Sequence, residues 1–227
     1  MITLREAFDN ATKSSDKWEP YFDVYERHLG WIQFMSKPIT LVEVGVQKGG
    51  SLEMWKEYVG PWGKVIGIDI DPICANLQYN SPNAKVVIGD QGDPAFWDSF
   101  LKDHKSIDIF IDDGGHFMDQ QVLTFEKVFP TMPLNSVYIC EDCHTSYMSY
   151  NGGGLGVKSS FIEYAKSLVD VIHKSWLQEM DSGIERKFKL VKDLTSIHFY
   201  DSMVVFEKRG KQDMIRVCPK EFTQDKT

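Results

Sequence analysis

The chain has 227 residues, of which 42% are hydrophobic, and its formal net charge is −8 at pH 7. This length and composition are sufficient for one α/β domain with a single substantial core and a few additional elements. The acidic charge, without any concentration of Lys or Arg, argues against a surface that follows a nucleic-acid backbone. We therefore expect no nucleic-acid partner and favour a small molecule.

The sequence shows no signal for export or for membrane insertion. No apolar stretch reaches the roughly 18 residues that a membrane span requires, and the first residues lack the apolar core of a secretion signal. We therefore expect a cytoplasmic protein without membrane contact. In that compartment the four cysteines, Cys74, Cys140, Cys143 and Cys218, are most simply reduced thiols.

The N-terminal part of the chain, from about residue 4 to 37, carries aromatic and aliphatic residues at helical spacing, and Pro38 ends it. This spacing predicts a helical lead-in. We divide the chain into that lead-in at 1–38, one α/β domain at 39–210 and a polar tail at 211–227.

From residue 40 the sequence alternates between short apolar runs and amphipathic stretches. The apolar runs predict five buried strands, at 40–45, 64–69, 84–90, 106–112 and 136–140. Helices are predicted between them, at 51–58, from Asp71 onward, at 94–101 and at 119–129. This alternation predicts a Rossmann-like, doubly wound α/β fold with a mostly parallel sheet.

The C-terminal third predicts a different ending. A long helix is expected at 159–180 and a short edge strand at 188–191, followed by a β-hairpin at 195–208 with Asp201 and Ser202 as its turn. The glycine-rich segment 151–156 predicts a mobile loop, which could close over a substrate or serve only as a connection. The predicted sheet thus ends in a C-terminal antiparallel hairpin.

Two short acidic segments follow neighbouring strands of the predicted sheet. Each contains two carboxylates and one histidine: Asp112, Asp113 and His116 in the first, and Glu141, Asp142 and His144 in the second. The carboxyl ends of parallel strands meet at one edge of a sheet, where open α/β proteins bind their ligands. Carboxylates suit a hard cation, and histidine can accept a proton near neutral pH. We therefore expect a metal ion and a proton acceptor here.

The second acidic segment also spells Cys-x-x-Cys-His, from Cys140 to His144, which is the pattern for attachment of c-type haem. Attachment needs an exposed motif in an oxidising compartment, whereas the residues up to Cys140 predict a buried strand. A structural zinc site would need four N or S ligands, and no second Cys/His pair has suitable spacing. We therefore assign the two cysteines to packing.

The loop between the first predicted strand and its helix, from Glu43 to Ser51, is rich in glycine, which lets a ligand approach the backbone. It lacks the dinucleotide fingerprint because Gln47 stands at the second glycine position, which disfavours NAD and FAD. Asp69 ends the second strand, where an acidic residue can accept hydrogen bonds from a ribose, and Asp90-Gln91 after the third strand suits an adenine edge. These features together predict a nucleoside without a pyrophosphate.

These motifs resemble those of class I S-adenosylmethionine methyltransferases, and more narrowly those of the metal-dependent O-methyltransferases of macrolide deoxysugars, the demethylmacrocin and mycinamicin group. The resemblance extends from about residue 16 to 208 and rests on the Glu-x-Gly-x-x-x-Gly-Gly-Ser loop, Ile68-Asp-Ile-Asp71-Pro, Gly89-Asp-Gln91, Ile111-Asp-Asp-Gly-Gly-His116, Glu141-Asp-x-His-Thr-Ser-Tyr147 and Ile197-His-Phe-Tyr-Asp-Ser202. It implies a seven-stranded sheet, bound S-adenosylmethionine and Mg²⁺, and methyl transfer to a hydroxyl of a sugar or other vicinal diol.

The resemblance also implies a role for each matching residue. Glu43, Gly45, Gly49 and Ser51 would border the methionine half of the cofactor, Asp69 its ribose, Asp90 and Gln91 its adenine, and Asp112 its amino-acid end; Asp113, Glu141 and Asp142 would ligate the metal, and His116 would be the general base. His144 is a second candidate for the base.

Two other functions stay open at this point. One is a cephalosporin-type tailoring enzyme on the same scaffold, because that family has comparable acidic motifs. The other is a non-catalytic nucleotide-binding module. For the methyltransferase we expect a sugar or glycosylated natural product as acceptor, and the resemblance suggests a homo-oligomer.

Overall fold

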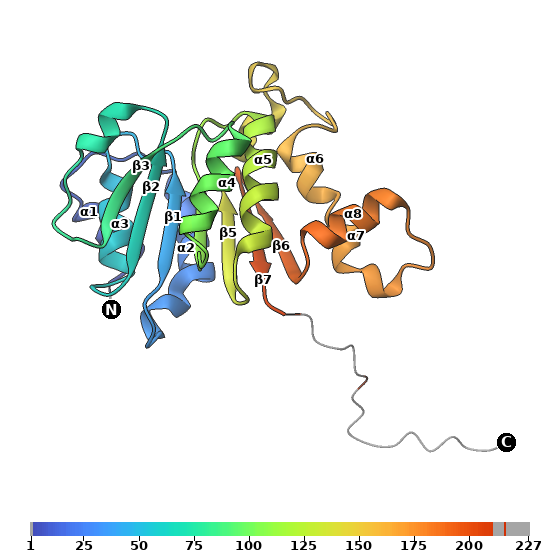
Figure 1. Ribbon diagram of the computed structural model, residues 1–227, viewed down its shortest axis with the longest axis horizontal. Coiled ribbons are helices and arrows are strands. Elements are labelled where there is room, and N and C mark those ends of the chain that lie inside the picture. The colour runs from blue at the N-terminus through green and yellow to red at the C-terminus, as the bar shows by residue number, and fades with distance from the viewer. Residues whose placement is uncertain (1, 211–215, 217–227) are drawn as a thin grey trace.

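The computed structural model describes residues 2–210 and residue 216. Seven strands form one sheet in the order β3-β2-β1-β4-β5-β7-β6 (Figure 1). The strands are β1 (Thr40–Val44), β2 (Lys64–Asp69), β3 (Ala84–Ile88), β4 (Ile109–Asp112), β5 (Ser136–Cys140), β6 (Leu194–Tyr200) and β7 (Met203–Lys208). Strands β1 to β5 pair in parallel, and β7 pairs antiparallel with both β5 and β6. The predicted sheet and its closing hairpin are confirmed.

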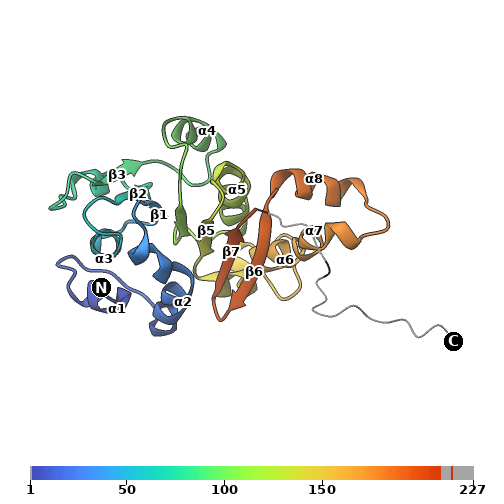
Figure 2. The ribbon, with the colours of Figure 1, turned by 90° about the horizontal axis from the view of Figure 1, so that it is seen from below.

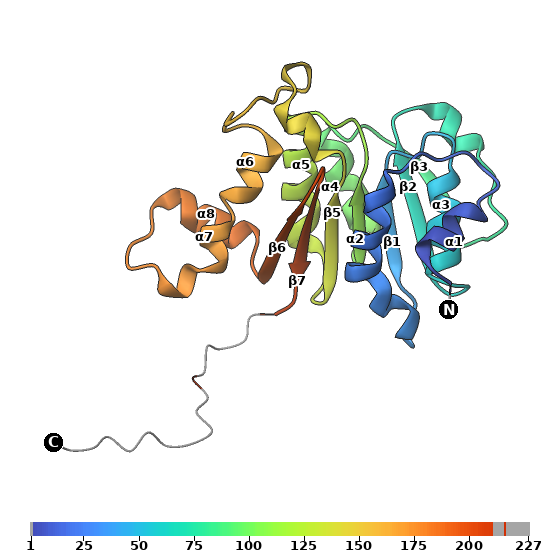
Figure 3. The same ribbon diagram turned by 180° about the vertical axis from the view of Figure 1, so that it is seen from behind.

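Helices cover both faces of the sheet. The α-helices are α1 (Leu4–Asp9), α2 (Glu19–Leu29), α3 (Gly50–Tyr58), α4 (Pro94–Asp103), α5 (Met118–Val128), α6 (Phe161–Lys166), α7 (Val169–Ile172) and α8 (Ser182–Leu190). Figure 2 shows α4 and α5 on one side of the sheet and α1, α2 and α3 on the other, and Figure 3 shows the latter side. None of the helices within the described residues is both long and apolar enough to cross a bilayer.

Each buried strand supplies side chains to two cores, because successive residues of a strand point to opposite faces. In β1, Val42 and Val44 join the core beneath α4 and α5. Leu41 joins the core beneath α1, α2 and α3. This two-sided burial explains why the central strands are nearly continuous apolar runs rather than alternating ones.

The helix predicted from Asp71 is only a 3-10 helix, Pro72–Asn76. The Asp71 side chain accepts a hydrogen bond from the backbone N–H of Ile73 at 2.9 Å, which fixes a tight turn at the start. Helices of the 3-10 type rarely extend beyond one turn because their hydrogen bonds are poorly aligned, and this one ends in extended backbone at Leu77.

The single long helix predicted at 159–180 is wrong. The structure instead has α6 and α7, followed by a 3-10 helix at Lys174–Trp176. The break falls at Ser167, whose hydroxyl donates to the carbonyl of Tyr164 at 2.5 Å. Such a side-chain bond competes with the helical ladder, and the β-branched residues of α7 have low helix propensity.

The edge strand predicted at 188–191 is also wrong, because Phe188 to Leu190 form the last turn of α8. Helix α8 begins at a strong cap, where the side chain of Asp181 accepts from the backbone N–H of Ile184 at 2.8 Å. Lys187 and Lys189 lie in its last turn, where positive charge favours a helix. The local capping signals were thus stronger than the short apolar run.

Candidate functional site

The two acidic segments meet at the carboxyl edge of the sheet, as their positions predicted. Strands β4 and β5 run side by side with Asp112 paired to Cys140, so the residues that follow them are neighbours. The Nε2 atom of His116 lies 3.6 Å from Oδ2 of Asp142 and 4.0 Å from Oδ1 of Asp113. Ligand atoms of these three residues all lie within 4.8 Å of one another.

His116 and Asp142 both have left-handed backbone conformations, with φ of 56° and 51°. A residue with a Cβ rarely adopts this conformation, and it stores strain of about 1 kcal/mol or more. The Nδ1 atom of His116 is buried without a hydrogen-bond partner among the described residues. Strained backbone and an orphaned polar atom at one place indicate a functional site rather than an optimised structural one.

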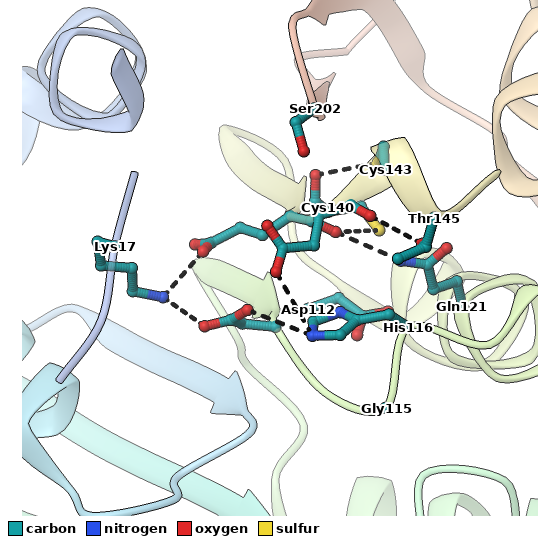
Figure 4. A network of polar contacts seen from close by, with 12 residues as sticks. Lys17, Asp112, Gly115, His116, Gln121, Cys140, Cys143, Thr145 and Ser202 are labelled. Atoms are coloured by element: carbon teal, nitrogen blue, oxygen red, sulfur yellow. Dashed lines mark hydrogen bonds and ion pairs between the residues drawn. The ribbon is translucent and has the colours of Figure 1, made fainter. Parts of the chain in front are cut away.

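A lysine that the sequence did not indicate enters this cluster from the segment between α1 and α2. The side chain of Lys17 is 2% exposed, and its Nζ lies 2.6 Å from Asp113 Oδ2, 2.8 Å from Glu141 Oε2 and 3.5 Å from Glu43 Oε1. Figure 4 shows Lys17 on one side of the carboxylates and His116 on the other. Because carboxylates surround it, the pKa of Lys17 stays well above its usual value despite burial.

Glu141 is the least accessible of the predicted metal ligands. Besides Lys17, it accepts a hydrogen bond from the Tyr25 hydroxyl at 2.5 Å, and it is only 1% exposed. Burial raises the pKa of Glu141 to about 8, although Lys17 opposes this shift. The glutamate therefore depends on a nearby cation to hold its negative charge.

Asp142 is held by the N-terminal part of the chain and by the hairpin turn. Its Oδ1 accepts from the Tyr21 hydroxyl at 2.8 Å and from Trp18 Nε1 at 3.2 Å. The same tyrosine hydroxyl lies 2.9 Å from Ser202 Oγ, and Nδ1 of His144 lies 2.5 Å from that Oγ atom. Helix α2 and the β6–β7 turn thus form one wall of the site.

A cavity of about 210 Å³ lies beside the acidic cluster, at the ends of β1, β2 and β3. Of the residues predicted to contact the cofactor it is lined by four, Gly45, Asp69, Asp90 and Gln91, together with the predicted metal ligand Asp113. Gly45 has φ of 95°, and a Cβ there would lie 1.9 Å from the carbonyl oxygen of Asp113. A glycine is therefore required where the first loop passes the acidic segment.

The other predicted cofactor residues do not line this cavity. The Glu43 carboxylate is fully buried and accepts from Ser51 Oγ at 2.5 Å and Trp55 Nε1 at 2.9 Å. Gly49, with φ of 86°, is the N-cap of α3. In this structure Glu43 and Ser51 support the loop and Lys17 from within.

Two predicted cofactor residues hold the loops at the edge of the cavity. Asp69 Oδ2 accepts from the backbone N–H groups of Val46 and Gln47, both at 2.9 Å. Gln91 donates to Asp112 Oδ1 at 2.5 Å and accepts from the backbone of Gly115 at 3.0 Å. These bonds fix the shape of the cavity rim.

Asp112, predicted to meet the amino-acid end of the cofactor, lies deep beneath the acidic segment. It is fully buried, and besides Gln91 it accepts from the Tyr138 hydroxyl at 3.1 Å. Burial raises its pKa to about 7, which the two hydrogen bonds only partly oppose. It therefore supports the acidic segment from beneath.

Sequence reasoning missed Lys17 and the wall residues Trp18 and Tyr21. Trp18 is 61% exposed although it is large and apolar, a feature that the structure reveals and the sequence does not. Lys17 is separated from Asp113 by 96 residues and from Glu141 by 124. No local pattern could have joined them.

No known family model matches the chain, but curated relatives do. It is 32% identical over 207 residues to the 8-demethyl-8-alpha-L-rhamnosyl tetracenomycin-C 2'-O-methyltransferase of Streptomyces olivaceus, covering 86% of this chain and 52% of the relative. It is 28% identical over 200 residues to the mycinamicin VI 2''-O-methyltransferase of Micromonospora griseorubida, covering 83% of this chain and 48% of the relative. The chain thus spans about half the length of the curated relatives it matches.

Solved structures support the same relationship. The MycE methyltransferase from the mycinamycin biosynthetic pathway, in complex with Mg and SAH, superposes with a TM-score of 0.70 at 25% identity, over 85% of this chain and 49% of that one. Its complex with Mg, SAH and mycinamycin VI gives a TM-score of 0.68 at 25% identity, covering 88% of this chain and 52% of that one. The chain is therefore a homologue of these O-methyltransferases and has the class I S-adenosylmethionine methyltransferase fold.

Proposed function

We propose that the protein transfers the methyl group of S-adenosylmethionine to a hydroxyl of a sugar or other vicinal diol. In this proposal His116 is the general base, and Asp113, Glu141 and Asp142 hold Mg²⁺. The observation that carries it is the position of His116 Nε2, 3.6 Å from Asp142 Oδ2 and 4.0 Å from Asp113 Oδ1, beside the 210 Å³ cavity. The O-methyltransferase activity of the curated relatives supports it.

The residues present fit a hard divalent ion. Oδ1 of Asp113 and Oδ2 of Asp142 face the same atom of His116, and oxygen ligands are those that Mg²⁺ prefers. Glu141 follows β5 next to Asp142, and its carboxylate already forms an ion pair with a cation, the Lys17 ammonium. When bound, Mg²⁺ would orient a diol and acidify one hydroxyl.

The chain itself then supplies the proton acceptor. His116 Nε2 accepts the proton of the acceptor hydroxyl, and the carboxylates of Asp113 and Asp142 stabilise the positive charge that the ring gains. Its left-handed backbone fixes the ring at the edge of the sheet. The base is therefore positioned before substrate arrives, which reduces the entropic part of the barrier.

The acceptor would lie against the wall of Trp18, Tyr21, His144 and Ser202. The exposed indole of Trp18 offers an apolar face to a sugar ring, and the polar groups beside it can bind hydroxyls. The segment 152–156 is irregular and contains Leu155 with 90% of its surface exposed, which suits a lid that closes over a bound sugar. A homo-oligomeric state and a cytoplasmic location stay predictions.

Calorimetry on the metal-stripped protein tests the proposal. S-adenosylhomocysteine should bind with and without Mg²⁺. Asp142→Ala should lose Mg²⁺ binding but still bind S-adenosylhomocysteine, the nucleoside probe. Methyl transfer should then be measured on glycosides with a vicinal diol, with the matching deoxy glycosides as controls. Absence of nucleoside binding would refute the whole proposal, and full turnover in a chelator would refute the metal assignment.

Lys17 supports a second candidate function. Because its ammonium already forms ion pairs with Asp113 and Glu141, the chain could bind S-adenosylmethionine without a metal, as a non-catalytic module. In that case the nucleoside would bind, Mg²⁺ would not, and no glycoside would be methylated. The same calorimetric experiment therefore separates the two candidates.

A further inference from the structure

A second group of potential metal ligands lies outside the acidic cluster and shares no residue with it. His28 is on α2, His198 on β6 and Glu207 on β7, and their ligand atoms all lie within 4.8 Å of one another. Nδ1 of His28 is 3.1 Å from Glu207 Oε1, and Nε2 of His198 is 3.9 Å from Glu207 Oε2. The two imidazole rings are 4.6 Å apart between centroids.

We propose that His28, His198 and Glu207 bind a zinc ion that joins helix α2 to the β6–β7 hairpin. Two imidazoles and one carboxylate are a common set of zinc ligands, with water as the fourth. Metal bonds of about 2.0–2.1 Å in a tetrahedron place neighbouring ligand atoms roughly 3.3 Å apart. The observed separations of 3.1 Å to Oε1 and 3.9 Å to Oε2 of Glu207 lie on either side of this value. They end on different oxygens of the carboxylate, so zinc binding would draw the two imidazoles toward one of these oxygens.

The surroundings of the cluster orient its ligands. Nε2 of His28 lies 2.9 Å from the Tyr200 hydroxyl, which leaves Nδ1 directed toward Glu207. Zinc-binding histidines normally use their second nitrogen in this way, as a donor to an outer partner. Ser196 Oγ donates to Glu207 Oε2 at 3.0 Å and so orients the carboxylate.

Charged side chains also surround the cluster. Two arginines oppose a divalent ion: Arg209, 3.2 Å from Glu207 Oε1, and Arg27, whose guanidinium lies over the Tyr200 ring.

A metal ion can still reach the cluster from solvent. The Arg209 side chain is 56% exposed and can turn into water when a cation replaces it. The His198 side chain is 38% exposed, which gives an entry path, while His28 closes the inner side with 4% exposure. Zinc would therefore strengthen the contact between the N-terminal helix and the C-terminal hairpin.

Zinc titration of the metal-stripped full chain tests this proposal, independently of methyl transfer. The Asp142→Asn background removes a ligand of the acidic cluster, so that the remaining binding reports on the second group. In that background Zn²⁺ should bind with one-to-one stoichiometry and raise the Tm. His198→Ala should weaken binding roughly 100-fold and abolish the Tm increase, because an outer-shell loss alone already costs about 10–100-fold.

Three further variants make the test specific. Tyr200→Phe removes only the outer partner of His28 and should weaken zinc binding about 10-fold. Glu207→Gln removes a ligand with little change in shape and should weaken zinc binding as much as His198→Ala. It keeps the test valid if His198→Ala folds poorly. His173→Ala is the control, because this histidine lies outside the cluster, and should bind zinc like its parent. Equal zinc affinity in the parent, His198→Ala and Glu207→Gln would overturn the proposal.

Discussion

The Nζ atom of Lys17 lies 2.6 Å from Oδ2 of Asp113, although the two residues are 96 positions apart. The lysine side chain is 2% exposed and lies on the segment that connects the two N-terminal helices. A buried ammonium requires carboxylate partners, and buried carboxylates require a cation. The connecting segment therefore carries the counter-charge of the acidic site.

Lys17→Met should destabilise the protein when no metal is present. Removing one partner of a buried ion pair costs about 3–5 kcal/mol of unfolding free energy, measured by urea denaturation in a chelator. Added Mg²⁺ should restore more stability to this variant than to the parent, because it supplies the missing positive charge. Lys13→Met is the control on the same segment: its partner Glu53 is partly exposed, so its loss should be about 1 kcal/mol or less. Equal stability of the two variants would contradict this role.

His116→Asn and His144→Asn should have different effects on methyl transfer. Loss of a general base reduces kcat by about 10²–10⁴-fold, and we expect this for His116→Asn with cofactor binding retained. His144 bonds to Ser202 in the wall, so His144→Asn should mainly raise KM. Steady-state kinetics on an accepted glycoside measures both. A larger fall in kcat for His144→Asn would make His144 the base.

Gly45→Ala should destabilise the fold because of a close approach as well as backbone strain. The new Cβ would lie 1.9 Å from the Asp113 carbonyl oxygen, in addition to adopting φ of 95°. Overpacking and left-handed strain together amount to about 3–5 kcal/mol. Gly60→Ala is the matched control, because φ is 76° there with nothing within 4 Å of the added carbon, and only about 1–2 kcal/mol is expected. Similar losses in both variants, measured by urea denaturation, would show that the approach to Asp113 is unimportant.

Asp112→Asn should change how stability depends on pH. Burial raises the pKa of Asp112 from 3.8 to about 7, so between these values the folded state holds a proton that the unfolded chain releases. Stability of the parent must then fall as pH rises through this window. Asp112→Asn lacks this contribution. Its unfolding free energy relative to the parent should therefore increase from pH 4 to pH 7, by at most about 4 kcal/mol.

Urea denaturation at several pH values, in a chelator, measures this difference. Burial also raises the pKa of Glu141 to about 8. Because both proteins contain Glu141, the stability of both should still decrease to some extent as the pH rises to about 8. Parallel stability curves for the parent and Asp112→Asn would show that the Asp112 carboxyl is not perturbed.

The parallel strands and the closing hairpin could be predicted because each has a local signature. Val42 and Val44 belong to an apolar run that ends in a glycine turn, and Asp201-Ser202 form the two-residue turn expected between β6 and β7. The helix predicted at 159–180 failed for a local reason too. The Ser167 hydroxyl bonds to a backbone carbonyl within its own turn, and apolar periodicity does not report that competition.

The acidic half of the site could be predicted because strand order places Asp113 and Asp142 at one edge. The remaining half depends on tertiary contacts. Lys17 and Tyr21 reach the site because α2 packs across the sheet, and the residues around them show no pattern that names their partners. The prediction that Glu43 borders the cofactor stays a prediction; its carboxylate is a buried acceptor for Ser51, a contact that the strand pattern does not indicate because a strand residue can point to either face.

The contact between Tyr21 and Ser202 joins residues 181 positions apart, and this has a consequence for synthesis on the ribosome. The acidic strand ends emerge long before the hairpin turn that completes their wall. Contacts of such sequence separation form late in folding because closing a long loop is entropically unfavourable. A nascent chain that ends before residue 202 therefore lacks the wall that Tyr21 and Ser202 form together.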